Sequence, residues 1–179
     1  MTVRGFPGPA ERVRENPFES SSGTDASRTG YVLRAWLVAA VPSLLYFLAL
    51  VLVGADSLRP PAGTLDAAFA AYSILAAPLL ETALMFPLGS LLELVIPRQT
   101  RIRIVLLAVI CALAHKFGGG WQQVVASFWP FLVYSATLTT WLKRSGRDAF
   151  VLTACVHALY NATFFGVGVL GSLAAAPGG

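Results

Sequence analysis

Charged residues are scarce in this sequence. Only 12% of its 179 residues are Asp, Glu, Lys or Arg, whereas 56% are hydrophobic, and a soluble domain carries about 25% charged residues. The mean hydropathy of +0.67 is typical of a protein that crosses a membrane several times. The formal net charge is +4, but the basic residues lie mostly in the tail and at the ends of apolar segments. This distribution indicates membrane topology and argues against a nucleic-acid partner.

Cysteine and histidine are scarce as well. The two cysteines, Cys111 and Cys155, lie inside separate apolar segments, which excludes the disulfide framework of a small secreted domain. Each is expected to be a small buried hydrophobic side chain. The two histidines, His115 and His157, also lie inside apolar segments. Any function that depends on imidazole is therefore expected within the membrane.

Five apolar segments predict an all-α fold, a polytopic bundle of about five transmembrane helices. The segments cover residues 31–54, 66–96, 104–117, 121–142 and 149–173. The second is longer than the roughly 20 residues that span a bilayer, so we expect it to tilt, to break, or to kink at Pro78 or Pro87. The glycine run at 118–120 predicts a turn or an unwound stretch.

The chain divides into a tail and one helical domain. Residues 1–29 mix Pro, Gly, Ser and charges of both signs with few large apolar side chains, which predicts a disordered cytoplasmic tail. Residues 30–173 are expected to form the transmembrane helical domain. Residues 174–179 would be a short C-terminal tail.

The connections between the segments predict the orientation of the bundle. Basic residues gather in the second and fourth connections, whereas the first and third are nearly neutral. The gathered residues are Arg98, Arg101, Arg103, Lys143, Arg144 and Arg147. By the positive-inside rule, this alternation places the N-terminus inside and the C-terminus outside. We therefore expect an integral, multi-pass protein of a prokaryotic plasma membrane, in contact with membrane lipid.

Strongly polar side chains are few in the middle of these segments. They are Glu81 in the second segment, His115 in the third, and His157 and Asn161 in the fifth. Each alone has a structural explanation, because a protonated Glu, a His or an Asn can bond a neighbouring helix. Ionisable groups at membrane depth are costly, however, and they usually face a bundle interior or a watery cavity where they have a function. His157 and Asn161 are four residues apart and so share one helix face.

The same residues carry a resemblance to a known family. "ETALMF" (81–86), "CALAH" (111–115) and "HALYN" (157–161), in this order on separate segments, resemble the three motifs of the CPBP intramembrane proteases. That family includes CAAX prenyl endopeptidases and Abi-like bacteriocin-processing and immunity proteins. Its pattern is Glu-Glu-x-x-x-Arg, then Phe-x-x-x-His, then His-x-x-x-Asn or His-x-x-x-Asp.

The sequence matches this pattern at four positions and differs from it at three. Glu81, His115, His157 and Asn161 fall on the first Glu, the second-motif His and the third-motif pair. The second Glu of the first motif is replaced by Thr82, its Arg by Phe86, and the Phe of the second motif by Cys111. The minimal catalytic set is kept, and the supporting charge pair is lost.

The resemblance implies an intramembrane endopeptidase without a cofactor. A desolvated Glu81 suits general-base work near neutral pH and would take a proton from water. His115 would hold that water or shuttle the proton. His157 and Asn161 would donate hydrogen bonds to the developing oxyanion. The substrate would be a peptide or protein, with or without an attached lipid.

Several alternatives remain at this stage. Glu81, His115 and His157 form a set that can ligate zinc or another divalent metal, although no second carboxylate is then left to act as base. A Cys₂His₂ zinc site would use both cysteines and both histidines, but Cys155 and His157 are two residues apart and do not share a face. A haem held by the two histidines is a further reading. Finally, the chain can be an inactive relative that serves as a membrane scaffold or immunity protein.

Overall fold

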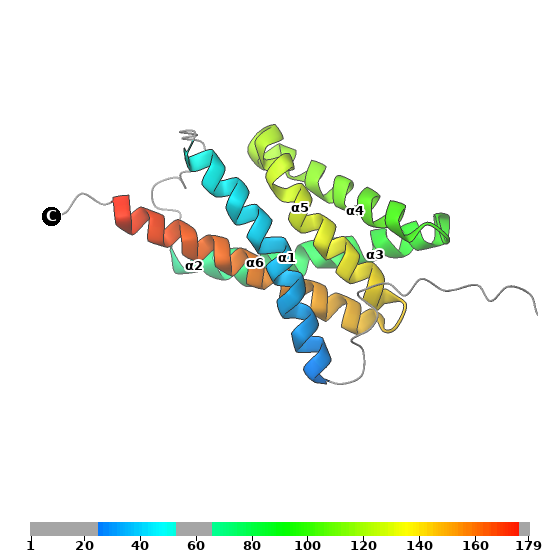
Figure 1. Ribbon diagram of the computed structural model, residues 1–179. Helices are drawn as coiled ribbons and strands as arrows, with labels where there is room; N and C mark the ends of the chain where they lie inside the picture. The colour runs from blue at the N-terminus through cyan, green and yellow to red at the C-terminus, as the bar shows by residue number, and fades with distance from the viewer. Residues whose placement is uncertain (1–24, 53–65, 176–179) are drawn as a thin grey trace, which may run out of the picture.

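The computed structural model describes residues 25–52 and 66–175, and this part of the chain is helical, without a strand (Figure 1). Its elements are α1 (Asp25–Leu52), α2 (Ala67–Ala71), the π-helical turn η2 (Tyr72–Ala76), α3 (Ala77–Val95), α4 (Thr100–Ala114), α5 (Lys116–Leu142) and α6 (Gly146–Ala175). Because α2, η2 and α3 follow one another without a break, they form one helical rod. Each predicted apolar segment thus corresponds to one rod, and the predicted all-α fold is confirmed.

Three of the helical rods are long and apolar enough to cross a membrane. They are Ser27–Leu52, Ala67–Val95 and Gly146–Ser172. Helix α4 has 15 residues, fewer than the roughly 20 that cross a bilayer. Helix α5 is interrupted near its start at Gly120, where φ is 67° and ψ is −162°, as the glycine run predicted. The count of five spans and the orientation of the bundle stay predictions.

The helix ends differ in part from the predicted boundaries. Helix α1 begins at Asp25, so residues 25–29 of the predicted tail are helical. Helix α6 continues to Ala175, past the predicted end of the helical domain. The rest of the two predicted tails, residues 1–24 and 176–179, lies outside the described residues.

The second apolar segment is neither broken nor divided at a proline. Instead, the helix passes through the π-turn η2, and Pro78 then lies in the first turn of α3. Pro87 lies inside α3. One face of α3, with Pro78, Thr82 and Met85, is buried. This is the side of the helix to which Glu81 also belongs, because residues 78, 81, 82 and 85 recur at helical spacing.

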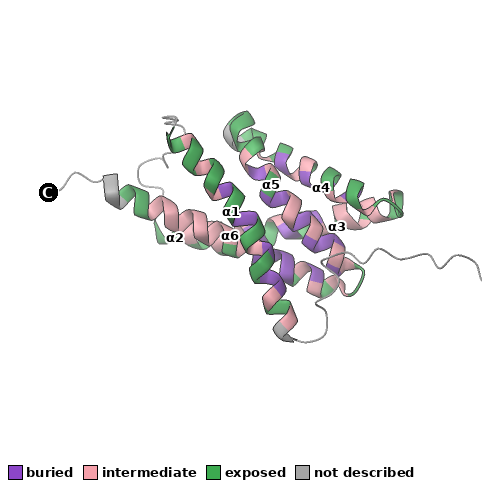
Figure 2. Cartoon of the chain, in the orientation of Figure 1, coloured by how far each residue is buried: buried purple, intermediate pink, exposed green. Residues whose placement is uncertain are grey.

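Small side chains let the helices approach closely at the centre of the bundle. Ala35, Ala39, Ala108, Ala112 and Ala149 are all buried, as expected where membrane helices pack by van der Waals contact. Larger buried side chains, above all Tyr134 and Leu138 of α5, fill the remaining space. Figure 2 shows the buried residues concentrated where α1, α5 and α6 cross, whereas the outer faces of the helices are exposed.

Two ion pairs connect helix ends. Arg28 and Asp148 are 2.9 Å apart and join the start of α1 to the start of α6. Arg103, whose side chain is 3% exposed, lies 3.1 Å from Glu93 and joins α4 to the end of α3. The first pair puts the starts of α1 and α6 on one side of the bundle. The positive-inside rule independently assigns both starts to the inner side.

Candidate functional site

Glu81 and the two histidines converge from separate parts of the chain. Oε2 of Glu81 lies 3.6 Å from Nε2 of His157 and 3.9 Å from Nε2 of His115. Glu81 is on α3, His157 is on α6, and His115 is the residue between α4 and α5. The predicted meeting of an acid with two imidazoles is therefore present in the structure. Both distances exceed a direct hydrogen bond, and Oε2 is buried without a hydrogen-bond partner among the described residues.

The ring of His115 is oriented by the backbone. Its Nδ1 lies 3.0 Å from the carbonyl oxygen of Cys111, one turn earlier in α4. A carbonyl can only accept, so Nδ1 must donate, and Nε2 of the neutral ring then carries a lone pair. That lone pair faces Glu81. His115 is thus arranged to accept a proton from a group bound beside the carboxylate.

The ring of His157 is oriented by packing. It stacks on the ring of Tyr134 with centroids 4.3 Å apart and planes at 25°, and it meets the edge of Phe131 at 5.9 Å. Its Nδ1 is buried without a hydrogen-bond partner in the described part of the chain. Such a nitrogen is unusual in a native interior. Nε2 is the ring nitrogen that faces Glu81, 3.6 Å from its Oε2.

Asn161 lies on the same face of α6 as His157, as predicted, but its amide is directed elsewhere. Nδ2 donates to the carbonyl oxygen of Ser73 in η2 at 2.7 Å. One of its two N–H groups is therefore engaged with the backbone. The structure brings Glu81, His115 and His157 together, and it places Asn161 beside them as a contact between helices.

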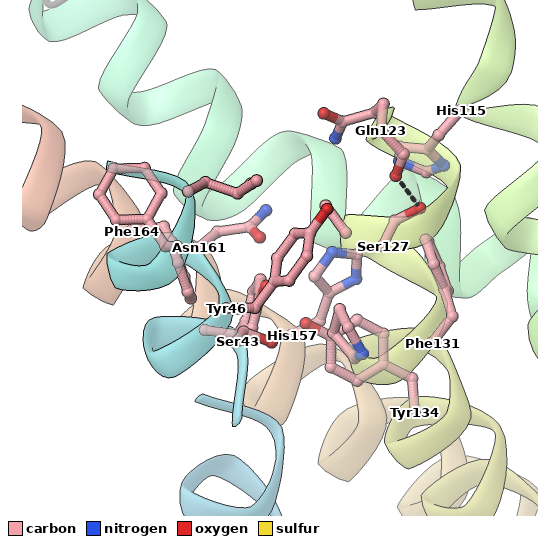
Figure 3. Close-up of a pocket in the computed structure, with 15 residues that line it drawn as sticks. Ser43, Tyr46, His115, Gln123, Ser127, Phe131, Tyr134, His157, Asn161 and Phe164 are labelled. Carbon is pink, nitrogen blue, oxygen red and sulfur yellow. Dashed lines mark hydrogen bonds between the residues drawn. The ribbon is translucent and has the colours of Figure 1, made fainter. Parts of the chain in front are cut away.

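A cavity of about 290 Å³ opens next to these residues (Figure 3). His115, His157 and Asn161 face it, whereas Glu81 does not line it: Oε2 of Glu81 lies 3.9 and 3.6 Å from the two imidazoles that do. Aromatic and small polar side chains form the remaining wall, among them Ser43, Tyr46, Phe47, Gln123, Ser127, Phe131, Tyr134, Tyr160 and Phe164. None of these residues was predicted from the sequence to belong to the site. Gln123 and Ser127 were detectable, because two polar residues one helical turn apart stand out in an apolar segment.

The positions where the sequence departs from the family pattern are packed, not charged. Thr82 is fully buried, and its hydroxyl has no partner among the described residues. Phe86 lies against the start of α6, where a Cβ added to Gly146 would be 3.2 Å from its ring. At Cys111 the backbone carbonyl holds His115. Thr82 and Phe86 are thus neutral side chains, and Phe86 packs against the start of α6.

Cys155 and His157 do not face the same surroundings, and the expectation that Cys155 is buried is wrong. Cys155 is exposed, whereas His157, two residues further along α6, is buried. A helix directs residues two apart to different faces. Within residues 25–52 and 66–175, no group of three or more His, Cys, Asp or Glu is arranged to hold a metal ion.

Comparison with known proteins yields no relative. No family model, no curated protein and no solved structure matches the chain. The resemblance to the CPBP proteases thus depends on the three short motifs, and it stays a prediction.

Proposed function

We propose that the protein is an intramembrane endopeptidase that hydrolyses a peptide bond with water activated by Glu81. The observation that carries the proposal is the approach of one carboxylate oxygen to both imidazoles, at 3.6 and 3.9 Å, from separate helices. The chain has only two histidines, and both take part. A carboxylate and two imidazoles beside a cavity are the groups that general acid–base hydrolysis requires.

The proposed chemistry distributes three tasks among three side chains. Glu81 takes a proton from a bound water as its oxygen attacks the carbonyl carbon of the substrate. His157 donates from Nε2 to the oxyanion that forms. The C–N bond then breaks, and the proton held by Glu81 passes to the leaving amine. The lone pair on Nε2 of His115 orients the attacking water by accepting its second hydrogen.

The proposed substrate is a peptide or protein segment that reaches the cavity from the membrane or its inner face. The cavity wall combines aromatic rings with hydroxyl and amide groups, which suits an apolar segment whose backbone must still be hydrogen-bonded. A lipid attached to the substrate is compatible with the same wall. In this proposal the bundle lies in a prokaryotic plasma membrane, with five spans, the N-terminus inside and lipid around its exposed apolar faces.

A second candidate function is a membrane scaffold or immunity protein without catalysis. The packing of Thr82 and Phe86 favours it, because neutral side chains, one buried and one partly buried, stand where the family pattern has the charge pair that would support Glu81. Glu81 and the histidines would then be interhelical contacts only. The two functions differ in whether the biological effect of the protein requires the Glu81 carboxylate.

The substitution Glu81→Gln separates these functions. We expect it to abolish the appearance of new peptide termini in membranes that contain the protein, because an amide cannot take a proton from water. The measurement is mass spectrometry of termini in cells that carry the wild type, the variant or neither. Asp66→Asn is the matched control: it removes one negative charge from the same helical rod, and Asn can accept the hydrogen bond that Phe69 donates to Asp66. Termini that persist in Glu81→Gln, or that depend equally on Asp66, would contradict proteolysis by this site.

A further inference from the structure

The π-turn η2 leaves the carbonyl of Ser73 without a donor from its own helix. In an α-helix the N–H of Ala77 would bond this carbonyl, but here it donates to Tyr72. The next donor along the chain would be residue 78, which is proline and has no N–H. In a segment that crosses a membrane, water does not replace the missing donors, so an unpaired carbonyl is costly.

Asn161 supplies the donor that the helix lacks. Its Nδ2 lies 2.7 Å from the Ser73 oxygen, which makes this a short contact for an amide hydrogen bond. The bond joins α6 to η2 at a carbonyl that the π-turn and Pro78 together leave without a helical donor. Asn161 is one turn from His157, and Ser73 is about two turns before Glu81. The contact therefore connects the two helices on which the acid and its buried imidazole are located.

We propose that Asn161 is a positioning residue, whose hydrogen bond to the Ser73 carbonyl fixes the Glu81 helix against the His157 helix. This role differs from the oxyanion contact predicted from the sequence. The bond between Asn161 and Ser73 would have the same structural consequence in an enzyme and in a scaffold. Only the description of Glu81 as the base depends on the proposed function.

A second-site substitution makes the inference testable. Asn161→Leu keeps the branched skeleton of the side chain and removes the donor. Pro78→Ala adds a backbone N–H through which the helix can satisfy the Ser73 carbonyl itself. If Asn161 acts through that carbonyl, Pro78→Ala should restore what Asn161→Leu loses. Thr163→Val is the matched control, because Thr163 is also on α6 but bonds Trp36 of α1.

The first measurement is thermal unfolding of the full chain in detergent. We expect Asn161→Leu to lower the midpoint by about 1–6 °C, the equivalent of one hydrogen bond. The double variant with Pro78→Ala should recover more than half of that loss. The loss from Thr163→Val should be the same with Pro78 and with Ala at position 78. Additive losses for Asn161→Leu and Pro78→Ala would overturn the proposal. If Asn161→Leu alone does not fold, the double variant must fold, and its failure would also overturn the proposal.

The second measurement is the ring ¹⁵N spectrum of the protein labelled at histidine. The spectrum contains the signals of His115 and His157 only. The spectrum of Glu81→Gln serves as a reference, because it shows how these signals shift when the neighbouring carboxylate is lost. We expect Asn161→Leu to shift the His157 signal, and Pro78→Ala to return it toward the wild-type position. A loss of stability alone would not move these signals in the folded protein. Signals that are unchanged in folded Asn161→Leu would overturn the positioning role. Neither measurement needs a substrate, so a failure of the proteolysis proposal would be recognised separately.

Discussion

His157 owes its place to aromatic packing. Its ring lies flat against Tyr134 and beside the edge of Phe131, while Nδ1 has no partner among the described residues. Aromatic pairs of this kind contribute about 0.5–1.5 kcal/mol beyond the area they bury. The packing holds the ring without hydrogen bonds, so its shape and its chemistry can be separated by substitution.

His157→Phe provides this separation. We expect the thermal midpoint to stay close to that of the wild type, because a phenyl ring can keep the stacking on Tyr134. Proteolysis should fall by about 10²–10³-fold, the usual effect of removing an oxyanion donor. Thermal unfolding followed by circular dichroism measures the midpoint, and mass spectrometry of peptide termini measures proteolysis. Undiminished cleavage would exclude His157 from the chemistry, and a midpoint that falls as far as in Tyr134→Ala would show that the ring is held in another way.

At the scale of residues, the carboxylate and the imidazoles of the site could be predicted and its aromatic members could not. A carboxylate or an imidazole in an apolar segment is costly in lipid, so Glu81, His115 and His157 stand out in the sequence. Phe131 and Tyr134 do not stand out, because an aromatic residue is equally at home in lipid, at the membrane interface or in a bundle core. The direction of the Asn161 amide also depends on a carbonyl that only the folded backbone exposes.

At the scale of single helices, the junction between α4 and α5 depends on a glycine. Gly120 has φ 67°, the one residue with a positive φ in the described chain, and it ends the short turn that follows His115. Only glycine takes up such a conformation without strain. A run of glycines predicts a turn at this place from sequence alone. The π-turn η2 gives no comparable signal, since apolar periodicity over "YSILA" is compatible with an ordinary α-helix.

Gly120→Ala tests whether this junction is required. A Cβ at Gly120 would meet nothing within 4 Å, so the backbone conformation is the only source of strain. We expect a loss of about 1–2 kcal/mol in the free energy of unfolding, measured by denaturation in mixed micelles. Gly166→Ala is the control: it too meets nothing within 4 Å, but it lies in α6 without a positive φ. That variant should be neutral or slightly stabilising. Equal effects of the two substitutions would refute a special backbone requirement at Gly120.

For the whole molecule, the sequence predicts the helical class and the approximate segments, because both follow from composition and from the length of apolar runs. The helix ends are less predictable: residues 25–29 are helical although four of the five are polar. Arg28 lies in these residues, and its ion pair with Asp148 joins the start of α1 to α6. The packing of the bundle, and hence the cavity, depends on contacts between segments that no single segment reveals.

The predicted orientation can be measured by cysteine accessibility. In a background with Cys111→Ala and Cys155→Ser, we expect Gln99→Cys to react with a membrane-impermeant maleimide only from the inner side of the membrane. Ser57→Cys, in the connection between the first two segments, should react only from the outer side. The expectation follows from the basic residues around Gln99 and the positive-inside rule. Reaction of both positions from one side would contradict the topology.

The central claim is that a single carboxylate faces both imidazoles inside the bundle. The most direct test is solid-state NMR of the protein in lipid, with ¹³C at the glutamate carboxyl carbons and ¹⁵N in the histidine rings, to measure carbon–nitrogen dipolar coupling. The structure predicts that the ring Nε2 of both His157 and His115 is coupled to a carboxyl carbon, because Oε2 of Glu81 lies 3.6 and 3.9 Å from these atoms. The coupling should disappear in Glu81→Gln. Imidazole nitrogens without coupling to any carboxyl carbon, or coupling that survives Glu81→Gln, would contradict the site.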